Sequence, residues 1–532
     1  MIFLPVIIAW LAGLLLAYHP MILSGLVYLQ TDLGDTRLNN YILEHSFLWV
    51  TRTVGHLNFW DPPLFYQLQN GAAYTEIHLG TAPFYWVWRM LGMAPFTAFQ
   101  FWMFTVSSLN FWAAWLWLHR GLRSLQINSF AAATGAFLFA FASSRVVQTG
   151  HQQLIAHFYT IIAFYALTRI FEGGLSRLSI PAWIGVFFAS VTAQLYAGFY
   201  LGWFLTFALG VGLLWALLCA RYRRSLVAVI RSHYLAILIS GALSGLALSW
   251  MMTHYLEAGK EVGYRPYESI QDLIPTPQSW LYLGNRSWLY SWQPRIKTFA
   301  VIAMQPEQCI GLGLITSACI AAGLVRARKN SGVRLMILSA LVIFFCVTLF
   351  PPKVTLWKTL FHVIPGAKAI RGLSRVGLLM LVPASLGLAL FFNDRKRMAT
   401  VAMLGILVAI EQGQTTSKFN KYENLAQIEL IVQRIKTEYP DCQAFYFSPI
   451  LRPGMDTPSW KYQLDAMWAG AHVNLPTING HSGNSPPGWE LLENRIKTPA
   501  DELSLSQRLN HWVQFKHLNA STVCWVKMPV ES

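Results

Sequence analysis

The fold is decided by the N-terminal run MIFLPVIIAWLAGLLLAYHPMILSGLVYLQ (1–30), followed at once by TDLGDTRLNNYILEH (31–45). The first part is apolar for long enough to cross about 30 Å of hydrocarbon. It has no basic n-region and no small-residue cleavage site, so we expect a retained first span and not a signal peptide. The second part sets Asp32, Asp35 and Glu44 close to a membrane surface. Acidic side chains are costly there, which points to a function for them.

The composition is that of a bilayer protein. Of the 532 residues, 55% are hydrophobic and only 12% are charged. We therefore predict an α-helical polytopic membrane protein with about 11 transmembrane helices. The expected spans are 3–27, 97–118, 129–142, 154–171, 180–197, 198–220, 233–252, 308–325, 335–350, 374–392 and 398–412.

The basic clusters predict the orientation, because short cytoplasmic loops carry an excess of Lys and Arg. The clusters begin at Arg120, Arg221, Arg326 and Arg395. With about 11 spans, all four fall on the same side as the N-terminus, which we place in the cytoplasm. The net charge of +16 then follows from topology and from contact with anionic membrane lipids, and no nucleic-acid partner is expected.

The same count divides the chain into a transmembrane domain, 1–412, and a soluble extracytoplasmic α/β domain, 413–532. The second domain lacks long apolar runs. Its expected helices lie near 423–438, 460–471 and 501–517, and its expected strands are 442–448 and 521–528. The transmembrane domain is expected to carry outer-face loops at 28–96, 143–153, 253–307 and 351–373.

Two of the six cysteines, Cys442 and Cys524, lie in the C-terminal region and in expected strands. If this region occupies an oxidising compartment, we expect a disulfide bond between them. The other four lie within or next to expected spans and are read as packing residues. No zinc-ligand spacing of cysteines occurs in the sequence.

Three interpretations of the first acidic loop compete. Asp32 or Asp35 could be a general base that deprotonates an acceptor hydroxyl while cations hold a phosphate leaving group. The acids could instead bind a coupling cation in a transporter, or only cap the helix that follows. Taken alone, the loop favours capping.

Cations elsewhere on the outer face shift this balance. Arg145 and His151 lie in SSRVVQTGHQQ, and Arg371 and Arg375 lie in IPGAKAIRGLSRVG. Their position opposes the positive-inside bias and suits an anionic group at headgroup depth, such as a lipid phosphate. The alternative is that Arg371 and Arg375 snorkel or bind ordinary phospholipid.

The order of several short motifs carries a family resemblance. Along the chain come GD (34–35), TE (75–76), R and GH (145–151), PG and RGLSR (365–375), and NGHSG with PPGW (479–489). This order resembles the GT-C superfamily of integral membrane glycosyltransferases, and in particular its large set of bacterial polytopic members.

The resemblance implies transfer of a sugar from a polyprenyl-phosphate donor to a glycan, lipid or protein acceptor at the outer face of the bacterial inner membrane. Asp35 matches the family's base or metal ligand, with Asp32 in reserve and Glu76 as a second acid. No cofactor is certain. A divalent cation, Mg or Mn, held by Asp35 and Glu76, is left open. The residues implied to face the donor phosphate are Arg145, His151, Arg371 and Arg375.

The loop INGHSGNSPPGW, which contains His481 and Ser482, is either an acceptor-contacting loop or a tight structural turn. It lacks the spacing and context of a nucleophile elbow, which argues against a Ser/His hydrolase. Two rival functions remain. A transporter or flippase for lipid-linked glycans would carry charged residues inside several spans. A catalytically inactive, lipid-binding scaffold would need no such feature.

Overall fold

The computed structural model describes residues 3–172, 179–393 and 398–530, and it divides into two compact units. Unit 1 comprises Met1–Leu23, Trp102–Ser249 and Tyr264–Ser417, and unit 2 comprises Ser24–Phe101, Trp250–Gly263 and Lys418–Ser532. The first outer segment therefore groups with the C-terminal region. Unit 2 therefore contains residues from both sides of the expected domain boundary at 412. That boundary stays a prediction about membrane topology.

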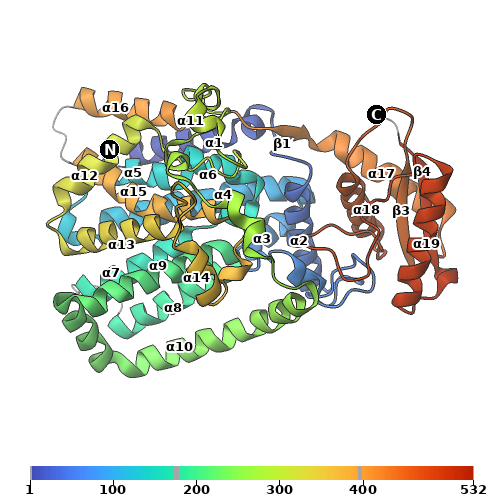
Figure 1. The fold of residues 1–532 in the computed structure, drawn as a ribbon, viewed down its shortest axis with the longest axis horizontal. Coiled ribbons are helices and arrows are strands. Elements are labelled where there is room, and N and C mark those ends of the chain that lie inside the picture. The colour runs from blue at the N-terminus through green and yellow to red at the C-terminus, as the bar shows by residue number, and fades with distance from the viewer. Residues whose placement is uncertain (1–2, 173–178, 394–397, 531–532) are drawn as a thin grey trace. The chain divides into compact units, whose positions relative to one another are not determined.

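Unit 1 is helical (Figure 1). The alanine-rich α5 and the helix α12 both pack against α15, where Gly323 lets α12 approach the backbone at Gly387. Two helices, α4 and α10, also contribute residues to unit 2. The helices are α1 (Leu4–Leu23), α4 (Pro95–Leu116), α5 (Ser129–Phe141), α6 (Ser143–Val147), α7 (Phe158–Glu172), α8 (Ile180–Ala197), α9 (Phe199–Leu218), α10 (Ala220–Val262), α11 (Lys297–Ala300), α12 (Leu314–Ala327), α13 (Ser331–Val347), α14 (Trp357–Val363), α15 (Val376–Asn393) and α16 (Met398–Glu411).

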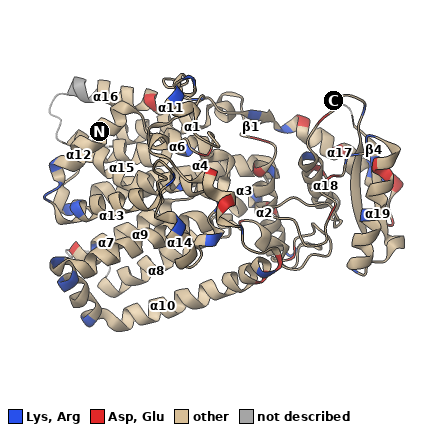
Figure 2. Ribbon diagram, viewed as in Figure 1, with Lys and Arg blue, Asp and Glu red and all other residues tan. Residues whose placement is uncertain are grey.

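Each of the predicted spans coincides with a helix of the structure. Within the described residues, 7 helical segments are long and apolar enough to cross a membrane, and α12 and α13 are shorter apolar helices. Figure 2 shows that the helices of this unit carry few charged side chains along their lengths. The molecule is thus a largely helical protein with membrane-spanning character, and the count of about 11 spans stays a prediction.

Unit 2 combines helices with two small sheets. Strand β1 pairs with β2 in antiparallel fashion, and β3 pairs with β4 in parallel, with Ala444 opposite Val523 and Ile450 opposite Pro529. The long α19 begins at a capping box formed by Thr498 and Asp501. The elements are β1 (Tyr28–Gln30), α2 (Asp35–Val50), α3 (Ala82–Met90), β2 (Lys418–Asn420), α17 (Lys421–Glu438), β3 (Ala444–Ile450), α18 (Ser459–Val473), α19 (Pro499–Phe515) and β4 (Val523–Pro529).

The five elements expected after residue 413 agree in type and position with α17, β3, α18, α19 and β4. Their local patterns suffice to predict them, because helical and strand periodicities differ. The helix α17 packs on α18 and against β4, and α18 packs on β3. The C-terminal residues thus form part of the α/β portion of unit 2.

Segment 143–153 differs from the expected outer loop. Residues Ser129–Gly150 form one helical, apolar segment that is largely buried, and Gln152–Leu154 form a further helical turn. Most of the expected loop at 143–153 is therefore helical, and its place on the outer face stays a prediction. The polar side chains in it are accommodated by internal bonds, which a sequence pattern does not reveal.

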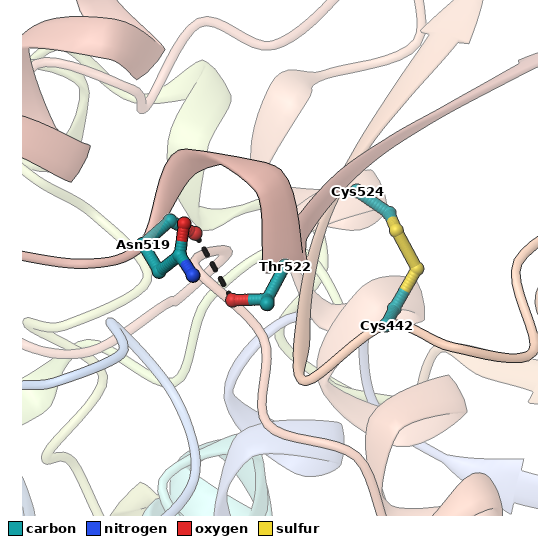
Figure 3. The surroundings of a disulfide bond; sticks show 4 residues. All are labelled: Cys442, Asn519, Thr522 and Cys524. Atoms are coloured by element: carbon teal, nitrogen blue, oxygen red, sulfur yellow. Dashed lines mark hydrogen bonds between the residues drawn. A yellow bond between two sulfur atoms is a disulfide. The ribbon is translucent and has the colours of Figure 1, made fainter.

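Cys442 and Cys524 are joined by a disulfide bond with a Cα–Cα distance of 5.9 Å (Figure 3). The bond ties Cys442, two residues before β3, to the partner strand β4. In the adjoining turn, the Thr522 hydroxyl donates to the carbonyl of Asn519 at 3.0 Å.

Loss of this disulfide is expected to destabilise unit 2. The bond closes a loop with a sequence separation of 82 residues, and removing a bond of this kind typically costs about 2–5 kcal/mol. Thermal unfolding of the double variant Cys442→Ser/Cys524→Ser, compared with the wild-type protein with and without reductant, measures the effect. Cys346→Ser, which removes a half-buried free thiol, is the control. Non-reducing mass mapping that found two free thiols at 442 and 524 would contradict the assignment.

Candidate functional site

The N-terminal turn of α2 carries the two acids singled out in the sequence. The Asp32 Oδ1 atom accepts hydrogen bonds from the backbone N–H groups of Gly34, at 2.7 Å, and Asp35, at 3.1 Å. Asp32 therefore satisfies the donors that a helix start leaves unpaired. Asp35, half-buried in the first helical turn, does not make this capping contact.

His481 lies next to these two carboxylates. Burial lowers the pKa of its imidazole below the ordinary value, while the nearby charges of Asp35 and Asp32 act in the opposite direction and Arg37 adds to the lowering. The imidazole is therefore neutral at neutral pH. Asp35 and His481 are thus brought together from the two ends of the chain.

The loop that carries His481 is held by buried polar contacts. The Asn479 side chain accepts from the Phe447 N–H at 2.6 Å and donates to the Phe447 carbonyl at 3.1 Å, which ties the loop to β3. Gly480 faces the ring of Phe65, where any side chain would overlap it. The Ser482 hydroxyl donates to the Asn484 carbonyl. In this loop Ser482 has a structural contact, and the loop positions His481.

A buried ion pair fixes α2 against α18. Arg37 donates to Asp465, and the side chains are 0% and 3% exposed. The Trp468 indole donates to the Arg37 carbonyl at 3.3 Å. Because Arg37 follows Asp35 by two residues, this pair also fixes the helical turn that carries the candidate base.

The segment that contains Glu76 is linked to the same helix. Two residues later, His78 Nε2 donates to Asn39 Oδ1 at 2.6 Å, and Asn39 Nδ2 donates to the Asp35 carbonyl at 2.8 Å. Burial lowers the pKa of His78 to about 3, so this imidazole is neutral. The segment of Glu76 is thus tied to the main chain of Asp35.

The residues described here do not complete a metal site. Across 3–172, 179–393 and 398–530, no group of three or more His, Cys, Asp or Glu side chains is arranged to hold a metal ion. The divalent cation stays a prediction.

Arg145 belongs to unit 1 and is engaged internally. Its guanidinium donates to the carbonyls of Phe139, at 2.9 Å, and Leu154, at 3.2 Å, and to His157 Nδ1 at 3.1 Å. The residue is only 3% exposed. These contacts join α5 to the start of α7, and a contact of Arg145 with a donor phosphate stays a prediction.

His151 and Arg375 meet at Glu307, a residue that the sequence did not single out. His151 Nε2 lies 2.8 Å from Glu307 Oε1, and Arg375 Nη2 lies 3.2 Å from the same oxygen. Arg375 Nε also donates to Glu307 Oε2 at 3.2 Å. Burial alone would raise the pKa of the Glu307 carboxyl, but His151 and Arg375 hold it well below its ordinary range.

Arg371 and Arg375 share one aromatic neighbour, Tyr200. The Arg371 backbone N–H donates to the Tyr200 hydroxyl at 3.0 Å, and the Arg375 guanidinium lies 4.9 Å from the centre of its ring. Arg375 is buried, whereas Arg371 is exposed. Two of the four predicted phosphate ligands, His151 and Arg375, therefore contact one carboxylate, and Arg371 is presented to the surroundings.

No protein-family model matches the sequence, and no curated protein matches it. Solved structures do match. The fold resembles that of an archaeal oligosaccharyltransferase. The crystal structure of the Archaeoglobus fulgidus enzyme tethered to an acceptor peptide aligns with a TM-score of 0.50 and 10% identity, over 97% of this chain and 68% of that one.

Two further structures of the same archaeal enzyme align less closely. The complex with Zn and sulfate gives a TM-score of 0.49 at 12% identity, over 90% of this chain. The complex of AglB with an inhibitory peptide and a dolichol-phosphate gives 0.48 at 13%, also over 90%. This chain spans 62% and 64% of their lengths. At such identities the likeness establishes the fold alone.

Sequence reasoning missed Glu307, Arg37 and Asp465. Glu307 is an acid in the expected outer segment 253–307, so the search that singled out Asp35 could have found it. No local sequence pattern identifies Arg37 and Asp465, because the ion pair that they form joins residues 428 positions apart in the sequence.

The Glu307 cluster predicts a pH dependence of stability. The lowered pKa of this carboxyl means that its contribution is complete above its ordinary pKa of about 4.3 and is lost as the pH falls below that value. Glu307→Gln is expected to lower the Tm near pH 7 and to flatten its fall between pH 5 and 3.5. Thermal unfolding across that range measures both effects, with the exposed Glu268→Gln as control. If the plots of Tm against pH were parallel for the wild type and Glu307→Gln, the lowered pKa assigned to Glu307 would be contradicted.

Proposed function

We propose that the protein is a membrane glycosyltransferase that transfers a sugar from a polyprenyl-phosphate-linked donor to an acceptor at the extracytoplasmic face. The observation that carries the proposal is the placement of His481 within electrostatic range of Asp35, with its ring centre 6.3 Å from that of Trp460, which packs against Gly34. Asp32 accepts from the backbone N–H groups of Gly34 and Asp35 and so holds the start of that helix. The likeness of fold to an oligosaccharyltransferase is consistent with this reaction class.

In the proposed reaction, Asp35 accepts the proton of an acceptor hydroxyl as that oxygen attacks the anomeric carbon. The bond from this carbon to the donor phosphate oxygen breaks, and the electron pair leaves with polyprenyl phosphate. A phosphate ester is already anionic and needs no general acid. Proton transfer to a positioned base typically contributes about 10²–10⁴-fold to the rate. We assign to the neutral imidazole of His481 the role of donating its N–H to this carboxylate, which only accepts hydrogen bonds.

The donor phosphate is assigned first to Arg371, because its side chain is exposed. His151 and Arg375 are held by Glu307 and would orient the segment that carries Arg371. Arg145 is left out of the assignment, since its guanidinium already serves internal carbonyls. A single well-placed donor to developing charge contributes about 3 kcal/mol.

The acceptor class is left open among glycan, lipid and protein, and we place the protein in the bacterial inner membrane with the site outside the cytoplasm. The apolar helices support the membrane location. The alternatives are a flippase for lipid-linked glycans and a catalytically inactive lipid-binding scaffold. They differ from the proposal in predicting no donor consumption.

The decisive experiment offers purified protein in lipid a panel of radiolabelled polyprenyl-phosphate sugars. Donor consumption by the wild-type protein that disappears in Asp35→Asn would support a glycosyltransferase and would name the sugar. Tight donor binding without consumption by either protein would favour the scaffold or the flippase. Repeating the assay with a chelator, and then with Mg or Mn restored, tests the predicted cation.

A further inference from the structure

A cavity of unit 2 adjoins the candidate base and is not used by the proposed chemistry. Its volume is about 390 Å³, within the size of small-molecule sites. It lies between the start of α18, the segment after the His481 loop, and α19. The lining residues are Ser459, Trp460, Glu490, Leu492, Glu493 and Arg508.

Trp460 connects this cavity to the N-terminal turn of α2. Its ring lies 3.5 Å from the position that a Cβ on Gly34 would take, so it packs against the backbone just before Asp35. The ring centre is also 6.3 Å from that of His481. A group bound against Trp460 would therefore be separated from the backbone that precedes Asp35 by this one aromatic ring.

The polar groups of the cavity are held in place by their own partners. Glu493 Oε1 accepts from the Ser459 hydroxyl at 2.8 Å and from Arg495 Nε at 2.7 Å, and Oε2 accepts from Arg495 Nη2 at 2.6 Å. A carboxylate has about four acceptor sites, so Oε2 retains capacity for a ligand hydroxyl. Arg508 donates to the Glu490 carbonyl at 2.7 Å, which fixes its guanidinium at the cavity.

The charges around the cavity balance. The carboxylates of Glu490 and Glu493 are matched by the guanidinium groups of Arg495 and Arg508. A half-buried indole with fixed carboxylate and guanidinium groups suits a ligand with an apolar face and a rim of hydroxyls. A pyranose ring has this chemistry, and the charge balance favours a neutral one over a charged sugar or a phosphate.

We infer that this cavity, with Trp460 as its platform, binds a neutral saccharide of the acceptor and delivers its hydroxyl to Asp35. This inference rests on the proposed function and commits it to a glycan or glycolipid acceptor. The pyranose stacks on Trp460, and its hydroxyls bond to Glu493 and Arg508. Trp460 is thus a specificity-determining residue, and Asp35 remains the group that takes the proton.

The first test measures binding of cellobiose and chitobiose to the full-length protein in lipid nanodiscs by saturation-transfer NMR. Trp460→Ala is expected to bind about tenfold more weakly than wild type, because one aromatic contact is lost. Trp460→Phe should retain most of the affinity. Phe515→Ala is the matched control, since it removes an exposed aromatic side chain of the same unit that does not line the cavity.

The second test uses the transfer reaction. Trp460→Ala should raise the acceptor KM about tenfold while leaving donor binding unchanged, and Asp35→Asn should abolish transfer while leaving saccharide binding unchanged. These readouts separate the two ideas. Full transfer by Asp35→Asn would overturn the proposed function. Absence of saccharide binding, equal binding by wild type and Trp460→Ala, or binding of an acceptor peptide in place of the disaccharides would overturn the inference.

Discussion

Asp35→Asn is expected to lower sugar transfer by about 10²–10⁴-fold while the protein keeps its wild-type Tm. The substitution removes the group that takes the acceptor proton, and general-base catalysis is worth this much. The helix start should survive, because Asp32 still accepts from the backbone N–H groups of residues 34 and 35. Initial rates with the donor identified in the panel assay provide the measurement.

Two neighbouring variants sharpen this test. Asp35→Glu keeps a carboxylate at a changed distance and should retain a low level of transfer. Asp32→Asn keeps a side-chain oxygen that can accept from the same backbone N–H groups, so it should change the rate by only a few fold. Full transfer by Asp35→Asn, or a larger loss from Asp32→Asn, would show that the base is assigned to the wrong residue.

The largest loss of stability is expected from Asp465→Asn. The change leaves the Arg37 guanidinium buried without its counter-charge, and the two side chains are 0% and 3% exposed. Removing one partner of such a pair typically costs about 3–5 kcal/mol. Chemical unfolding of the protein in detergent, followed by a probe of unit 2 such as labelling of an introduced buried cysteine, measures the loss.

The chain offers a matched control for this variant. Arg434 and Glu438 form an ion pair within α17, with side chains 36% and 44% exposed. Glu438→Gln should therefore cost about 0.5 kcal/mol or less. A double variant, Arg37→Met/Asp465→Leu, should recover much of the stability, because it removes both buried charges. Equal losses from Asp465→Asn and Glu438→Gln would refute the proposed importance of the buried pair.

These predictions depend differently on sequence and structure. Asp35 could be singled out from its sequence context, as an acid next to a glycine after an apolar span. Its partner His481 lies far along the chain, and no local pattern joins the two. The same holds for Arg375 and Glu307, which form a pair across 68 positions. At Arg145 the sequence pattern was misleading. The segment reads as a polar loop, but in the structure it is a buried helical segment in which the guanidinium donates to internal carbonyls.

The sequence by itself determined the apolar helical character, the positions of the apolar helices and the elements of the C-terminal region. These properties follow from composition and periodicity, which act over a few to about 20 neighbouring residues. Only the tertiary structure decided which acid caps α2, which cations are engaged by Glu307, and which aromatic residue lies beside Asp35. These contacts join segments that are far apart in the sequence. They form because a buried charge without a partner raises the free energy of the folded state.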